Sequence, residues 1–217
     1  MPLTFAGTID HAAVLRAVDQ LTDLVAVPGI VDAWEHESAL PGMTLGGLTR
    51  HLVSQPECAV EFLRQPPPEG AQTLSLADYF ARVDWLHAPV DSPENTSIRD
   101  DFNAMAAGGP QESRGVLAWS RGELPSALAG AGPAVFVPWQ GCSLQVDDFL
   151  VCRLMEVVVH ADDLAASLGR AAPAFDEEVL DPVLALLAVL AVRRHDQGAV
   201  VRALSRSERA GGPVSAF

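Results

Sequence analysis

The stretch RLMEVVVHADDLAASLG, residues 153–169, constrains the fold more than any other part of the sequence. Glu156 and His160 lie four residues apart in it, among residues that are mainly leucine, valine and alanine. Residues four apart lie on one face of an α-helix, with Cβ atoms about 6 Å from each other. A carboxylate and an imidazole in apolar surroundings are costly unless they are paired or bind a metal ion. The stretch therefore predicts a largely buried helix that carries one polar ridge.

The ridge extends beyond this pair in both directions along the predicted helix. Four residues lie on it at intervals of three, four and three: Arg153, Glu156, His160 and Asp163. We expect Arg153 and Asp163 to lie just outside the ligands of any metal ion. Asp163 could accept a hydrogen bond from the ring nitrogen of His160 that does not bind the ion. An ordinary salt bridge is an equally good interpretation of Asp163.

A second apolar stripe contains a candidate for the third ligand. Leu45, Leu48, His51 and Leu52 follow a helical repeat after Thr44, a residue suited to capping a helix. His51 is thus predicted to face inward. Two histidines and one carboxylate leave an open position on zinc or another divalent ion, as catalytic sites do. Glu–His pairs four apart are also common as simple paired groups on helices, so a purely structural ridge stays open.

The remaining sequence predicts a mostly helical chain with recognisable start and stop signals. Thr8 is expected to cap a helix over residues 14–25, and Ser143 a long helix that reaches Leu168 and ends at Gly169. Residues 134–139, AVFVPW, form the only strand-like run, and one strand cannot form a sheet. Pro56 is expected either to kink or to divide the helix of His51. Further helices are expected over residues 75–86, 95–108, 112–124 and 198–211, and from near Pro182.

Charge and cysteine content exclude several classes of function. The chain has 14 Lys and Arg against 28 Asp and Glu, a net charge of −14, which disfavours nucleic acid and anionic membranes as partners. Its three cysteines lack C-x-x-C spacing, which argues against a disulfide framework or a cysteine zinc site. No secretory signal is evident, and the apolar run at residues 183–192 is too short to span a membrane. We therefore expect a cytoplasmic protein, with a homodimer left open.

Two motifs and two shorter stretches resemble a known family. ALPGMTLGGLTRHL and RLMEVVVHADDLAASLG, with NTSIRDDF and VVRALSRSERA, are similar to the mycothiol-dependent maleylpyruvate isomerases and DinB-like proteins of actinobacteria. The resemblance implies an all-α, DinB-like four-helix bundle over residues 1–170. Isomerases of that family have a second domain after the bundle, and this sequence departs from them: over residues 171–217 we expect only a helical extension packed on the bundle, with no full second domain. Arginines in that extension are treated as surface charges: Arg202, Arg206 and Arg209.

The resemblance also implies a metal and a cosubstrate. Its metal ligands, carried over by position, are His51, Glu156 and His160, and the ion is a divalent metal, most often zinc. The thiol that the resemblance implies is mycothiol. A divalent ion lowers the pKa of a coordinated thiol below its free value of about 8.5, so it would supply a thiolate at neutral pH. The thiolate could add to a small electrophile and leave after bond rotation, as in an isomerase, or remain, as in an S-transferase.

Two alternatives stay open beside this reaction. One is a site that activates water on the same metal. The other is a DinB-like protein that binds a small molecule or a metal without turnover. No catalytic or cofactor-binding residue beyond the metal ligands is assigned.

Overall fold

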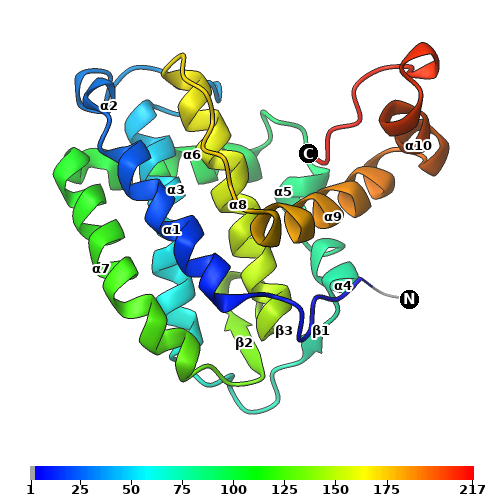
Figure 1. Cartoon of the computed structure of the whole chain (residues 1–217), viewed down its shortest axis with the longest axis horizontal. Coiled ribbons are helices and arrows are strands. Elements are labelled where there is room, and N and C mark those ends of the chain that lie inside the picture. Colours follow the sequence, from blue (N-terminus) through cyan, green and yellow to red (C-terminus); the bar gives the residue numbers. More distant parts are fainter. Residues whose placement is uncertain (1–2) are drawn as a thin grey trace.

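The structure is a computed structural model that describes residues 3–217. Its centre consists of four helices that pack side by side: α1 (His11–Val25), α3 (Leu45–Leu63), α7 (Gly109–Ala129) and α8 (Val146–Ser167). α1 and α3 each contact both α7 and α8. α1 and α8 run in one direction, and α3 and α7 run in the other (Figure 1). The predicted mainly helical fold class is confirmed, and this packing is consistent with a DinB-like bundle.

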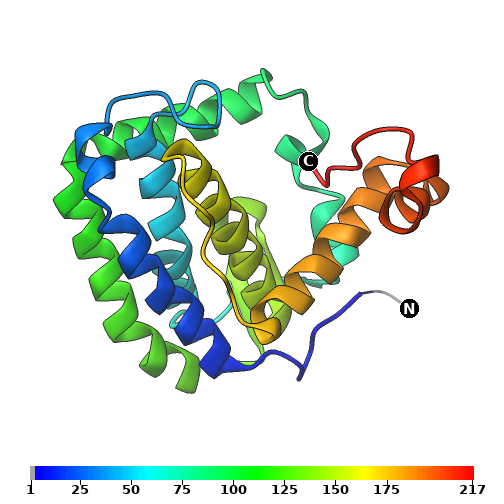
Figure 2. The same ribbon diagram turned by 45° about the horizontal axis from the view of Figure 1, so that its top comes forward.

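Shorter elements surround this centre. α6 crosses one end of the bundle and contacts α3, whereas α9 contacts α8 and α1 and projects to one side (Figures 1 and 2). In the described part of the chain no helix has the length and apolar character needed to cross a membrane. The remaining helices are α2 (Pro28–Asp32), α4 (Leu76–Phe80), α5 (Asp84–His87), α6 (Pro93–Met105), α9 (Glu177–Arg194) and α10 (Gln197–Ser205), with the 3₁₀ turns η1 (Ala106–Gly108), η2 (Pro138–Gln140) and η3 (Ser207–Arg209).

Several predicted helix signals are confirmed. The Thr44 side chain caps α3 by accepting a hydrogen bond of 2.9 Å from the Gly47 amide. Gly169, just after α8, has a φ of 62°, a left-handed conformation that favours glycine at the end of a helix. Pro56 lies inside α3 without dividing it. The helix that carries His51 is therefore continuous through its whole length.

Three of the predicted boundaries are wrong. Thr8 donates its hydroxyl to the Phe5 carbonyl, and the side chain of Asp10 caps α1 instead. Ser143 lies in a strand, and α8 begins three residues later. Thr8 and Ser143 each carry a hydroxyl that could cap a helix, but the backbone next to them forms other hydrogen bonds. The helix expected over residues 75–86 is divided into α4 and α5, with extended backbone at Val83 between them.

The expectation that the chain has no sheet is also wrong. A three-stranded sheet has the order β1-β3-β2, made of β1 (Thr73–Leu74), β2 (Ala134–Val137) and β3 (Cys142–Gln145). β2 and β3 pair antiparallel, and β1 pairs with β3 in parallel. β1 has only two residues and comes from a distant loop, so no local pattern marks it. The sheet joins the end of α7 to the start of α8 beneath the bundle (Figure 1).

The C-terminal helix α9 shares the hydrophobic core of the bundle. Four of its residues belong to the same buried cluster as the helices of the centre: Val179, Val183, Leu186 and Leu190. This packing places α9 against α8, the helix of the polar ridge. The division of the chain at residue 170 stays a prediction.

Two buried carboxylates at the start of α8 hold the N-terminal segment in place. Asp148 Oδ1 accepts a hydrogen bond of 2.7 Å from the Phe5 amide, and the Thr4 hydroxyl lies 3.2 Å from both of its oxygens. Asp147 Oδ2 accepts from the Gly7 amide at 2.5 Å. Negative charge is favourable in the first turn of a helix because of the helix dipole. These contacts fasten residues 4–7 across the end of the bundle.

We expect Asp148→Ala to lower the free energy of unfolding by about 1–3 kcal/mol, because it leaves the buried Phe5 amide without an acceptor. Asp148→Asn should cost less. It keeps an acceptor oxygen and avoids burying a charge, and burial already raises the pKa of Asp148. Urea unfolding of both variants measures the difference, with exposed Asp162→Ala on the same helix as the control. An Asp148→Ala variant as stable as the control would contradict this account of the N-terminal contacts.

Candidate metal centre

His51, Glu156 and His160 meet between α3 and α8. Each offers one ligand atom, and these atoms all lie within 4.8 Å of one another. Glu156 Oε2 is central, at 3.1 Å from His160 Nε2 and 3.9 Å from His51 Nε2. The three side chains are only 13–15% exposed. The structure thus brings together the three residues that the sequence singles out as candidate ligands, although α3 and α8 are far apart in the chain.

The packing of α6 on α3 covers His51. The Phe102 ring stacks on the His51 ring, with centroids 4.0 Å apart and planes 13° from parallel. Next to Phe102, the side-chain oxygen Oδ1 of Asn103 accepts hydrogen bonds from the Thr44 amide and hydroxyl at 2.9 and 3.1 Å. A Cβ at Gly47 would come within 2.3 Å of that oxygen, so only glycine allows this approach. α6 is therefore held where Phe102 shields one face of the site.

No sequence motif marks these residues of α6 as part of the site. Phe102 and Asn103 lie in a stretch with a weak helical pattern, and nothing in it connects them with His51. The one available signal is Gly47, because a glycine inside a helical pattern often marks a close approach of another segment.

Asp163 lies next to His160 on α8, as the spacing of the polar ridge predicts. Its Oδ2 is 3.0 Å from Nδ1 of His160, which accounts for one ring nitrogen and leaves Nε2 facing Glu156. A carboxylate on one nitrogen of a histidine fixes the orientation of the ring and the position of its proton. His51 lacks such a partner, because its Nδ1 is buried without a hydrogen bond to any of the residues 3–217.

Arg153 lies on the ridge but does not form a hydrogen bond or ion pair with the three candidate ligands. Its Nη1 donates to Gln55 Oε1 at 2.6 Å, and Gln55 in turn donates to the backbone carbonyl of His51 at 3.0 Å. Arg153 acts on the site through its charge, since it contributes to lowering the pKa of both His51 and Glu156. The direct hydrogen-bond partner of Arg153 is therefore Gln55 of α3, and a place for Arg153 beside a bound ion stays a prediction.

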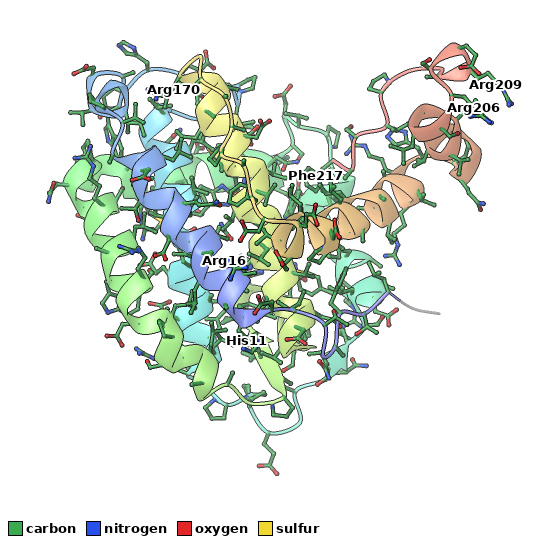
Figure 3. The ribbon with its side chains drawn as sticks, viewed as in Figure 1. His11, Arg16, Arg170, Arg206, Arg209 and Phe217 are labelled. Carbon is green, nitrogen blue, oxygen red and sulfur yellow. The ribbon has the colours of Figure 1, made fainter. Side chains whose placement is uncertain are left out.

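The arginines of the C-terminal segment lie elsewhere. Arg206 and Arg209 are exposed at the outer end of that segment, beyond α10 and away from the bundle (Figure 3). Arg202 lies in α10 and is partly buried. None of these three has a contact with the His51, Glu156 and His160 cluster among the described residues.

The charges of the site favour an ion pair in the metal-free protein. Burial would lower the pKa of His160, but hydrogen bonds to Asp163 and Glu156 outweigh burial and raise it to about 9. Burial would raise the pKa of Glu156, but the hydrogen bond and charge of His160 lower it to about 2. Burial and the charge of His160 lower the pKa of His51 to about 3. A proton on His160 Nε2 thus joins the imidazolium to the Glu156 carboxylate, with His51 neutral.

We expect Asp163→Asn to lower the pKa of His160 in the metal-free protein by at least about one unit, because an opposite charge within hydrogen-bond distance is lost. Since the folded pKa of His160 is raised, its contribution to stability is complete below about pH 6.5 and is lost as the pH rises through about 9. Titration of the histidine Cε1 proton by NMR measures the shift. Asp162→Asn is the control, and equal titration of both variants would contradict the role given to Asp163.

Comparison with known proteins places the chain in a family. A family model described as the mycothiol maleylpyruvate isomerase N-terminal domain matches residues 14–165. Comparisons with curated proteins and with solved structures give no match. The matched region includes α3, all but the last two residues of α8 and all three candidate ligands, and it covers well over half of the 217 residues. The chain therefore belongs to the mycothiol maleylpyruvate isomerase N-terminal domain family.

Proposed function

We propose that the chain is a divalent-metal-dependent and mycothiol-dependent enzyme that isomerises a small electrophilic metabolite. The observation that supports this most directly is the meeting of His51, Glu156 and His160 in a member of a mycothiol isomerase family. Transfer of the thiol to the metabolite, as an S-transferase, is the related outcome of the same first step. Both reactions need the same arrangement of residues.

The three side chains fit a divalent ion in number, type and spacing. Zinc binds histidine and carboxylate at about 2.0–2.2 Å, so the ligand atoms of a tetrahedral site are roughly 3.3–3.6 Å apart. The separations of 3.1 and 3.9 Å from Glu156 Oε2 lie on either side of that range. Two neutral nitrogens and one carboxylate are also the ligands that leave an open position in catalytic zinc sites. When bound there, the ion would lower the pKa of a coordinated thiol and supply a thiolate at neutral pH.

The surrounding residues would prepare the site for such a ligand. Asp163 would accept a hydrogen bond from the Nδ1–H group of His160, so that Nε2 keeps its lone pair toward the ion. Phe102 would keep the His51 ring in one orientation and exclude water from one side. Glu156 would contribute the single negative charge among the three ligands. The proton that His160 shares with Glu156 in the metal-free protein has to leave when the ion binds.

A thiolate supplied at this site would allow isomerisation without an external acid. A thiolate sulfur adds to the double bond of a conjugated carbonyl compound, and the electron pair moves to the carbonyl oxygen. Rotation about the new single bond follows, the electron pair returns, and the sulfur leaves. No proton is gained or lost overall. In the transferase outcome the adduct takes up one proton at carbon and keeps the sulfur.

Alanine at any one of His51, Glu156 or His160 should reduce bound zinc well below one ion per chain. Each substitution removes one of three protein ligands, and zinc sites with two protein ligands bind weakly. Elemental analysis after zinc loading and gel filtration measures the occupancy. His36→Ala, an exposed histidine of the same chain, is the matched control. Full occupancy in all three variants would make the polar ridge structural.

A cobalt-substituted form should respond to mycothiol with new charge-transfer absorption, because sulfur coordination produces bands that oxygen ligands do not. The apparent pKa of the response should lie below the free thiol value of about 8.5, since the ion favours the charged form. Turnover of maleylpyruvate with mycothiol, followed by loss of the cis isomer, tests the reaction itself. A spectral response without turnover would indicate a protein that binds the thiol without catalysing a reaction. A cobalt spectrum that does not change when thiols are added would exclude the thiolate mechanism.

A further inference from the structure

Three contacts hold the guanidinium group of Arg153 in a fixed plane. Its Nη1 donates to Gln55 Oε1 at 2.6 Å. Gln55 is itself oriented, because its Nε2 donates to the His51 carbonyl at 3.0 Å. The central carbon of the guanidinium lies 5.6 Å from the Trp139 ring centroid and 5.7 Å from that of Phe149, within the range of cation–π attraction. The side chain is therefore positioned before any ligand arrives.

One edge of this guanidinium has no partner in the protein. Nε of Arg153 is buried and has no hydrogen bond to any part of residues 3–217. Nη2, on the same edge as Nε, likewise donates to no described residue, and Arg153 forms no ion pair within them. Two parallel N–H groups on one edge match the two oxygens of a carboxylate. A buried donor without an acceptor is costly, so the free edge indicates an acceptor from outside the chain.

Arg153 is linked to the metal centre through Gln55, which accepts from Arg153 and donates to the His51 carbonyl. Arg153 precedes Glu156 by three residues, a rise of about 4.5 Å along the helix axis. Trp139, which lies under the guanidinium, is 53% exposed, so this side of the site has access to solvent.

A second arginine adds to the positive charge there. Arg50 is buried and pairs with Glu57 through Nη2 at 2.7 Å, but its Nη1 has no partner among the described residues. Burial raises the pKa of the Cys58 thiol to about 11, and the charges of Arg153 and Arg50 both oppose that rise. Both guanidinium groups thus act on the same part of α3. Glu57 pairs with Arg50, so of these two arginines only Arg153 lacks a carboxylate partner among the described residues.

We propose that the Nε and Nη2 edge of Arg153 binds a carboxylate group of the substrate and holds it beside the metal centre. The reaction that this substrate undergoes rests on the proposed function, but the unpartnered guanidinium edge is a feature of the chain itself. A carboxylate held there places the atoms a few bonds away next to His51 and Glu156. The structure therefore favours short electrophiles that carry a carboxylate near the double bond over uncharged ones.

Calorimetric binding of maleate, a short unsaturated dicarboxylate, tests the Arg153 edge in both the metal-free and the zinc-loaded protein. Arg153→Gln should weaken maleate binding at least tenfold in both forms, because charge-assisted hydrogen bonds are lost. Arg153→Lys should be intermediate, since lysine keeps the charge but has no paired edge. Exposed Arg121→Gln removes the same charge elsewhere and should bind maleate as the wild type does.

The outcomes separate this proposal from the proposed function. Dimethyl maleate and 2-mercaptoethanol are the further probes, and neither should be sensitive to Arg153→Gln. If Arg153→Gln loses stability, the Arg153→Lys variant and the preference for maleate over its ester decide the question. Equal binding of maleate by wild type and both Arg153 variants, or no binding by the wild type, would overturn the proposal. Zinc content and the cobalt response to thiols report on the metal centre independently of maleate.

Discussion

The buried carboxylate of Glu156 is the group on which the rest of the site depends. An ionised carboxylate at this depth is stable only if opposite charges or hydrogen-bond donors surround it. His160 supplies the nearest, His51 lies within 3.9 Å, and the charge of Arg153 adds to both. The packing of α3 against α8 brings His51 to the pair that Glu156 and His160 form on α8. The contact between α3 and α8 therefore determines both the fold around the site and the electrostatics of the site.

Much of the candidate site could be predicted from spacing alone. Glu156, His160 and Asp163 belong to one helix, and a helix has a fixed repeat, so their relative positions follow from their numbers. His51 required a second inference, that its own apolar stripe faces the same interior. The partners of Arg153 could not be found in this way. Gln55 and Trp139 come from other elements, and only the three-dimensional packing shows which of them reaches the guanidinium.

The fold, like the site, has parts that could be predicted from the sequence and parts that could not. Helices with a strong apolar repeat and a capping residue, such as α3, are predicted closely, because the signals are local. The hydroxyl of Ser143 suits a helix start, yet this residue lies in β3 and pairs with Thr73 in parallel. The pairing of β3 with β2 is local, whereas its pairing with β1 depends on residues about 70 positions away, which no local pattern records. The two-residue strand β1 has no signal of its own at all.

The separation of α3 and α8 along the chain also determines when the site can exist. His51 and Glu156 are about a hundred residues apart, and α6, α7 and the sheet lie between them in sequence. Contacts between such distant residues form late, because closing a long loop costs entropy before the contact stabilises anything. During synthesis His51 emerges well before the residues that it meets. A complete set of three ligands therefore becomes available only after α8 has been made and has docked, so the ion would enter a nearly folded protein and not a nascent one.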